Sequence, residues 1–133
     1  MPGGETILVV DDEVAVLSVM EMMLKRSGYT VITAASAQQA LNLFADWADL
    51  QVDLLLVDFV LPDMNGVELT RKIWERRPDL PALYFSAYSE HEELRPALAR
   101  GVPYIAKLFT ADQLTSRVRD ILDGHRGMAA DAR

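Results

Sequence analysis

The chain has 133 residues and a mass of 14.8 kDa, which suits one domain and is too short for two ordinary ones. Half of the residues are hydrophobic and a quarter are charged, a composition typical of globular proteins and unlike that of disordered chains. Thirteen basic and twenty acidic residues give a formal net charge of −7, which argues against direct binding to nucleic acids.

The sequence contains no cysteine, which removes disulfides, thiol nucleophiles and cysteine-based zinc sites. The first five residues lack the basic and apolar regions of a leader peptide, and no apolar run approaches the length of a membrane span. We therefore expect a cytoplasmic protein that inserts no segment into a membrane.

Five short apolar runs alternate with longer segments of helical periodicity, which predicts five strands and five helices. The apolar runs cover residues 7–10, 31–32, 54–57, 82–85 and 102–106. The first and third runs are apolar at successive positions, as strands covered by helices on both faces require. Because such alternating units are joined by right-handed crossovers, the pattern predicts an α/β fold with a doubly wound, five-stranded parallel sheet.

Side chains that accept hydrogen bonds from first-turn amides mark four helix starts: Ser36 with Gln39, Asn65 with Glu68, Ser89 with Glu92, and Thr110 with Gln113. Helix ends are indicated by Gly28, Gly101 and Gly124. Pro96 falls inside the fourth predicted helix, so we expect that helix to be kinked or to begin late. The domain is expected to occupy residues 5–123, with flexible tails at 1–4 and 124–133.

Polar side chains follow the ends of four predicted strands. Asp11 and Asp12 follow the first run, Asp58 the third, Ser86 the fourth and Lys107 the fifth. Each alone has an ordinary structural interpretation: a helix cap for the Asp pair, a turn former for Asp58, and surface or satisfied polar groups for the other two. Carboxyl ends of parallel strands form the crevice where such sheets bind ligands, so their joint placement favours a functional site.

Three carboxylates in one crevice repel one another, and oxygen-only ligands favour a hard divalent ion such as Mg²⁺. A carboxylate oxygen beside such an ion is able to attack phosphorus. Lys107 would then pair with a phosphoryl oxygen as a point charge, and the Ser86 hydroxyl would donate a hydrogen bond to another. The set of residues predicts phosphoryl transfer to a carboxylate.

These residues carry the pattern of a known family. Over residues 5–123 the chain resembles the receiver domain of bacterial two-component response regulators, of the kind found in chemotaxis. The resemblance lies in residues 9–13, which look like the family's acidic entry, in residues 58–66, which look like its phosphoacceptor segment, and in Ser86-Ala87 and Lys107. It implies a flavodoxin-like (βα)5 fold with strand order 2-1-3-4-5.

The resemblance also implies the role of each site residue. Asp58 would accept a phosphoryl group from the phosphohistidine of a histidine kinase, and Lys107 and Ser86 would contact that group. Mg²⁺ would be bound by Asp12, Asp58 and the backbone carbonyl of Val60, and by Asp11 through water. Tyr104 matches the aromatic residue that turns inward when the Ser86 hydroxyl moves toward the phosphate, so Ser86 and Tyr104 would form the switch.

The chain departs from the family at one position. Receivers usually have a proline after the conserved lysine, joined by a cis peptide bond, whereas this chain has Lys107-Leu108. A cis bond before a non-proline residue costs roughly 3 kcal/mol, so we expect a trans bond and an altered loop here. Self-dephosphorylation is expected to be slow, because the bulk of Val60 and Tyr88, which flank the site, would limit the approach of hydrolytic water.

The same residues bear on other functions. A phosphatase of the haloacid dehalogenase type needs an Asp two residues after its nucleophile, where this chain has Val60. A flavodoxin-like carrier needs amides and hydroxyls in the first loop instead of Asp11 and Asp12, and a dinucleotide enzyme needs a glycine-rich turn. The remaining alternative is a receiver-fold interaction module that is not phosphorylated, which Leu108 favours and the three acids disfavour.

The expected partners are proteins. A histidine kinase or phosphotransfer protein would donate the phosphoryl group, and a downstream target or output domain would receive the signal. The surface of the fourth helix, fifth strand and fifth helix is where receivers dimerise or engage targets. The chain would be either a stand-alone receiver or one excised from a hybrid sensor kinase or a larger regulator. The first helix, apolar on more than one face, would either be broadly buried or dock a partner helix.

Overall fold

A computed structural model describes residues 4–47, 49–86, 104–106 and 109–131. The strands are β1 (Thr6–Val10), β2 (Thr30–Ala34), β3 (Leu54–Asp58), β4 (Ala82–Ser86) and β5 (Tyr104–Ala106). The helices are α1 (Val14–Arg26), α2 (Ala37–Asp46), α3 (Gly66–Trp74) and α5 (Ala111–Asp131). The predicted fourth helix, with Ser89 and Pro96, lies outside the described residues.

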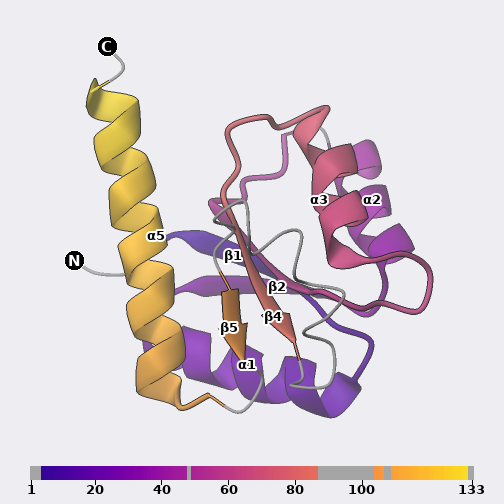
Figure 1. Ribbon diagram of the computed structural model, residues 1–133, viewed down its shortest axis with the longest axis horizontal. Helices are drawn as coiled ribbons and strands as arrows, with labels where there is room; N and C mark the ends of the chain where they lie inside the picture. The colour runs from indigo at the N-terminus through magenta and orange to yellow at the C-terminus, as the bar shows by residue number, and fades with distance from the viewer. Residues whose placement is uncertain (1–3, 48, 87–103, 107–108, 132–133) are drawn as a thin grey trace.

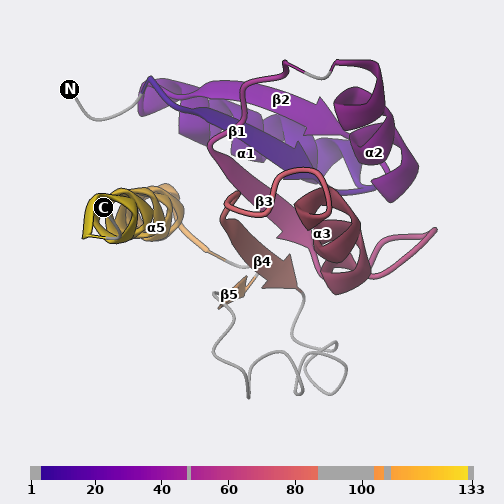
Figure 2. The ribbon, with the colours of Figure 1, turned by 90° about the horizontal axis from the view of Figure 1, so that it is seen from above.

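The strands form one parallel sheet in the order β2-β1-β3-β4-β5 (Figure 1). Viewed from above, the helices cover both faces of the sheet, with α1 and α5 on one face and α2 and α3 on the other (Figure 2). The predicted doubly wound parallel sheet is therefore confirmed, and four of the five predicted helices are described.

Alternation along the central strands divides the core into two layers. Leu8, Val10, Leu55 and Val57 pack with the residues of α2 and α3, whereas their neighbours in β1 and β3 pack with α1 and α5. All five residues of β3 are buried, as are four of the five in β1. Two-sided burial explains why these two strands are apolar at successive positions.

Helix starts follow the predicted caps at all three described positions. The Ser36 hydroxyl accepts from the Gln39 amide at 3.1 Å, Asn65 Oδ1 from the Glu68 amide at 2.8 Å, and the Thr110 hydroxyl from the Gln113 amide at 3.1 Å. Gly28 follows α1 with a φ of 96°, the left-handed conformation that favours glycine after a helix.

The predicted helix end at Gly124 is wrong, because α5 continues to Asp131. Gly124 does not have the positive φ of a terminating glycine. Within a helix a glycine costs about 1 kcal/mol relative to alanine, a penalty that a long helix anchored by buried Leu114, Val118 and Leu122 can absorb. Figure 1 shows the last turns of α5 extending past the ends of β4 and β5.

A charge network ties α5 to the amino end of β1. Arg119 contacts Glu5 at 2.6 Å and Asp123 at 2.8 Å, and it also donates to the Tyr29 hydroxyl at 3.3 Å. Hydrogen bonding to Glu5 raises the pKa of the Arg119 guanidinium above its ordinary range, and burial raises the pKa of Tyr29 above 10.0. We call Glu5, Tyr29, Arg119 and Asp123 the α5 charge network.

Among the described residues, no helix combines the length and hydropathy that a membrane span needs.

Candidate functional site

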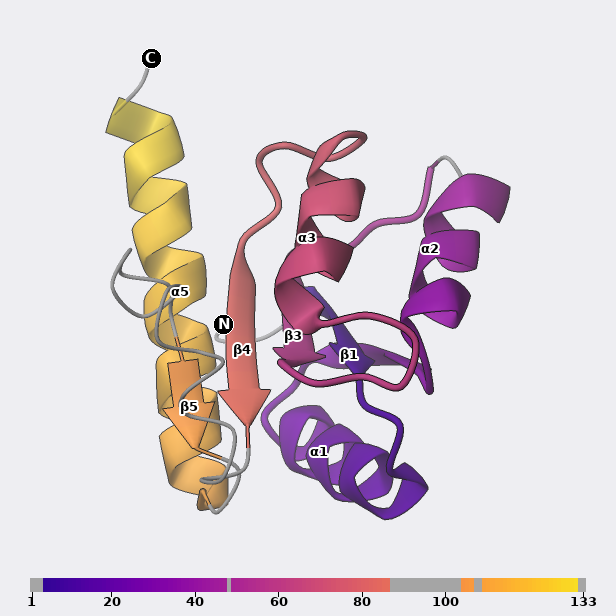
Figure 3. The ribbon, with the colours of Figure 1, turned by 45° about the vertical axis from the view of Figure 1, so that its right-hand side comes forward.

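The register of β1 and β3 brings two of the predicted acids together. Strands β1 and β3 are paired in parallel (Figure 3). Val10 is aligned with Val57, so the next residues along the chain, Asp11 and Asp58, follow at the carboxyl edge of the sheet. Carboxylate oxygens of Asp11, Asp12 and Asp58 all lie within 4.8 Å of one another. The predicted convergence of these three residues is confirmed; we call them the acid cluster.

The members of the acid cluster differ in burial. Asp11 is 0% exposed and Asp58 is 1% exposed, whereas Asp12 is open to solvent. The Asp11 Oδ1 atom accepts the Glu13 amide hydrogen at 2.8 Å, and the Asp58 Oδ1 atom accepts that of Val60 at 3.1 Å. Both buried carboxylates are thus oriented by the backbone two residues ahead.

The acid cluster is not simply a helix cap. The capping position of α1 is Glu13, and no side chain makes a cap hydrogen bond there. Burial of two like charges in one small volume is unfavourable without a cation. An oxygen-only donor set with two buried members and one solvent-facing member fits Mg²⁺, which keeps several of its waters and takes one or two carboxylates.

The segment that follows Asp58 is closed by its own backbone; we call residues 59–65 the acceptor loop. Val60 and Asn65 form an antiparallel bridge, and the Gly66 amide donates to the Phe59 carbonyl at 2.6 Å. A Cβ atom at Gly66 would lie 2.5 Å from the Asp58 carbonyl oxygen. Only glycine allows α3 to begin this close to the acceptor strand.

The remaining predicted site residues are placed to different extents. Ser86 ends β4, and its backbone is paired with Ala106 of β5, so it lies at the same edge as Asp58. Val60 is half-buried in the acceptor loop. Tyr104 begins β5, aligned with Tyr84. The side chains of Ser86 and Tyr104 lie outside the described part of the structure, as do Lys107, the Lys107-Leu108 bond and Tyr88.

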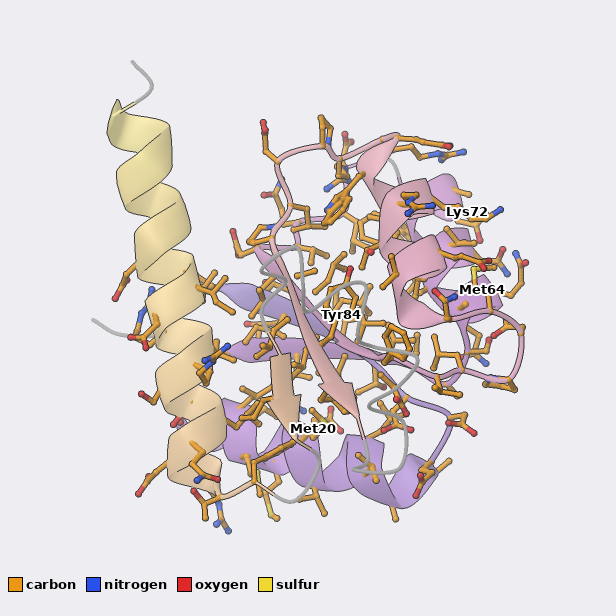
Figure 4. All side chains as sticks on the ribbon, viewed as in Figure 1. Met20, Met64, Lys72 and Tyr84 are labelled. Carbon is orange, nitrogen blue, oxygen red and sulfur yellow. The ribbon has the colours of Figure 1, made fainter. Side chains whose placement is uncertain are left out.

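Helix α1 is not broadly buried. Leu17, Met20 and Leu24 are buried against the sheet, and Figure 4 shows Met20 pointing from α1 toward it. Val14, Val19 and Met22 are exposed. The helix is therefore buried on one side and carries apolar side chains on another.

Sequence reasoning missed Asp63. Its carboxylate accepts hydrogen bonds from the amides of Ala37 and Gln38, which open α2. The partners precede it by 26 and 25 residues, so no local pattern in the sequence marks this contact.

Comparison with known proteins agrees with the geometry. Residues 7–119 match the family model of the response regulator receiver domain, so the chain belongs to that family. A solved structure of a CheY-like receiver domain protein from Methanospirillum hungatei is 30% identical, with a TM-score of 0.81, over 93% of this chain and 98% of the other.

The curated relatives are longer proteins. The sensor kinase CckA of Brucella abortus is 33% identical over 92% of this chain but only 13% of its own length. The response regulator SaeR of Staphylococcus aureus is 26% identical over 87% of this chain and half of its own length. The chain therefore spans between about an eighth and a half of these two relatives. Receiver domains are signalling modules of two-component systems, and this chain is one of them.

Proposed function

We propose that this receiver, over residues 5–123, accepts a phosphoryl group on Asp58 from the phosphohistidine of a histidine kinase or phosphotransfer protein. A carboxylate oxygen of Asp58 forms a bond to phosphorus as the bond between phosphorus and the donor imidazole nitrogen breaks. The imidazole nitrogen keeps the electron pair of the broken bond and is reprotonated from solvent. The observation that carries the proposal is the acid cluster, with Asp58 buried and held by the Val60 amide.

The chain's own residues would divide the work. Asp11, Asp12, Asp58 and the Val60 carbonyl would hold Mg²⁺, which when bound supplies the positive charge that offsets the carboxylates and the incoming phosphoryl oxygens. Backbone hydrogen bonds at Glu13 and Val60 keep the two buried carboxylates in place. Lys107 would pair with a phosphoryl oxygen, and Ser86 would donate to another.

The output would follow from movement of side chains on β4 and β5, the two strands farthest from β2 in the sheet. Ser86 and Tyr104 end β4 and begin β5, which are paired strands. We propose that they act as the switch, and that the surface around β5 and α5 engages a downstream protein, an output domain or a second copy of the chain. A cytoplasmic location is part of the same proposal, because histidine kinases phosphorylate receivers there.

The test is incubation of the purified chain with acetyl phosphate and Mg²⁺, followed by intact-mass and peptide mass spectrometry. The expected product carries one phosphoryl group on Asp58, and hydroxylamine removes it, as an acyl phosphate requires. Asp58→Asn abolishes labelling, whereas Asp46→Asn, an exposed carboxylate at the end of α2, leaves it unchanged. A wild-type chain that acquires no labile group would favour an unphosphorylated interaction module instead.

A further inference from the structure

Asp63 belongs to the acceptor loop but is bonded to a different element. Its Oδ1 atom accepts the Ala37 amide hydrogen at 3.2 Å and its Oδ2 atom accepts that of Gln38 at 2.9 Å. Ala37 and Gln38 are the first two residues of α2, a helix whose own first turn contains no acidic residue. The carboxylate thus supplies, from the loop after Asp58, the negative charge that a helix N-terminus favours.

The first turn of α2 is completed by two independent devices. One is local: the Ser36 hydroxyl accepts the Gln39 amide hydrogen at 3.1 Å, and Gln39 Oε1 accepts that of Ala35 at 2.8 Å. The other is the Asp63 carboxylate, whose two oxygens take the amides between them. Only the second device connects the helix to the acceptor loop. The first turn of α2 thus has two caps, and removal of one can be compared with removal of the other.

The loop has further attachments on the same side. Its internal bonds, from Val60 to Asp58 and from Gly66 to Phe59, close it on itself and on β3. Met64 packs against the core layer of α2 and α3, and Figure 4 shows it at the margin between these helices. Figure 3 shows the acceptor loop passing beside the start of α2. Asp63 is the hydrogen-bonded attachment that fixes the loop to this neighbour.

The hydrogen bonds of Asp63 also determine where its negative charge lies. Asp63 is a further carboxylate, five residues after Asp58, and a like charge turned toward the acid cluster would oppose both the anionic acceptor and the incoming phosphoryl group. Its two oxygens instead meet backbone N–H groups at the positive end of the α2 dipole. The charge of Asp63 is thus stabilised by the first turn of α2 and holds the loop to that helix.

We propose that Asp63 is a positioning residue for the phosphoacceptor. Its carboxylate holds the acceptor loop against the first turn of α2, and so fixes Val60 and the Asp58 carboxylate that Val60 orients. Helix α2 then belongs to the site although none of its side chains is in the acid cluster. This inference rests on the proposed function, since it concerns the residues that would hold Mg²⁺ and receive phosphorus.

The experiment compares Asp63→Ala with Ser36→Ala, which removes the local cap without touching the loop. For each variant we would measure the melting temperature, the Mg²⁺ dissociation constant by calorimetry, and the rate of phosphorylation by acetyl phosphate as Mg²⁺ is varied. Both variants are expected to lower the melting temperature by about 4 °C, since each loses a helix cap. Asp63→Ala is expected to weaken Mg²⁺ binding about tenfold, as loss of a supporting residue does at metal sites. Ser36→Ala leaves Mg²⁺ binding unchanged.

Two results would overturn the inference: equal weakening of Mg²⁺ binding in both variants, which would make Asp63 a helix cap only, or no weakening in Asp63→Ala. Asp63→Asn, which keeps one acceptor oxygen, should restore part of the affinity lost in Asp63→Ala. Failure of the proposed function would give a different result: the wild-type chain would bind Mg²⁺ without becoming phosphorylated. In that case the calorimetric comparison still decides the role of Asp63.

Discussion

Strand β1 has buried acidic residues at both ends, and their surroundings differ. Glu5, which precedes the strand and is 7% exposed, meets the opposite charge of Arg119 at 2.6 Å. Asp11, which follows the strand, is gathered with two further carboxylates. The contact with Arg119 makes Glu5 part of the scaffold, whereas three carboxylates within 4.8 Å of one another form a donor set that a metal ion can use.

The largest expected effect comes from breaking the α5 charge network. Arg119→Met leaves the Glu5 carboxylate buried beside an apolar side chain, and we expect the free energy of unfolding to fall by about 3 kcal/mol, measured by urea denaturation. Asp123→Asn is the control, because Asp123 is 61% exposed and its pairing with Arg119 is worth less than about 1 kcal/mol. A loss in Arg119→Met no larger than that of the control would contradict the scaffold role.

The second prediction concerns the acid cluster. Binding of a cation there should stabilise the folded chain, and so should removal of one of its negative charges. Mg²⁺ at a hundred times its dissociation constant is expected to raise the free energy of unfolding by about 2.7 kcal/mol, seen as a higher melting temperature. Without metal, Asp58→Asn should be more stable than wild type by about 1 kcal/mol, because one like charge is gone while Oδ1 still accepts from Val60.

Removing Mg²⁺ with a chelator should return the wild-type chain to its lower melting temperature, and Asp58→Asn should respond to the metal much less. Arg119→Met should keep the full response, since its lesion is at the other end of β1. A metal-free Asp58→Asn chain that is less stable than wild type would show that the repulsion within the acid cluster is already offset.

The smallest effect is a pH dependence at Tyr29. Burial raises the pKa of its phenol above 10.0, so the folded chain keeps this proton at pH values where the unfolded chain has lost it. The resulting contribution to stability is complete below pH 10.0 and disappears as the pH rises through the folded-state value. Urea unfolding between pH 9 and 11 should therefore show a steeper loss in wild type than in Tyr29→Phe; equal slopes would refute it.

Much of the scaffold could be predicted because its signals are local. Successive apolar residues identified β1 and β3, and side chains such as Ser36 and Asn65 marked helix starts that the structure reproduces. The meeting of Asp11, Asp12 and Asp58 was also predictable, since strand ends in a parallel sheet share one edge.

What could not be predicted depends on contacts between distant residues. Asp63 looks like an ordinary turn residue until α2 is folded beside it, and Arg119 looks like a surface charge until Glu5 is buried beneath α5. Gly124 was misread for a different reason: a glycine ends a helix only where it adopts a positive φ, and its identity alone does not fix that angle.

The pairing of Glu5 with Arg119 joins residues 114 positions apart. During synthesis Glu5, beside β1, therefore cannot pair with Arg119 until nearly all of the domain has left the ribosome. In a nascent chain that ends before α5, Glu5 would have no contact with Arg119, and burial of its carboxylate at the start of β1 would be unfavourable. We therefore expect chains that end before α5 to bury β1 less stably and to be cleaved by proteases more readily than the whole domain.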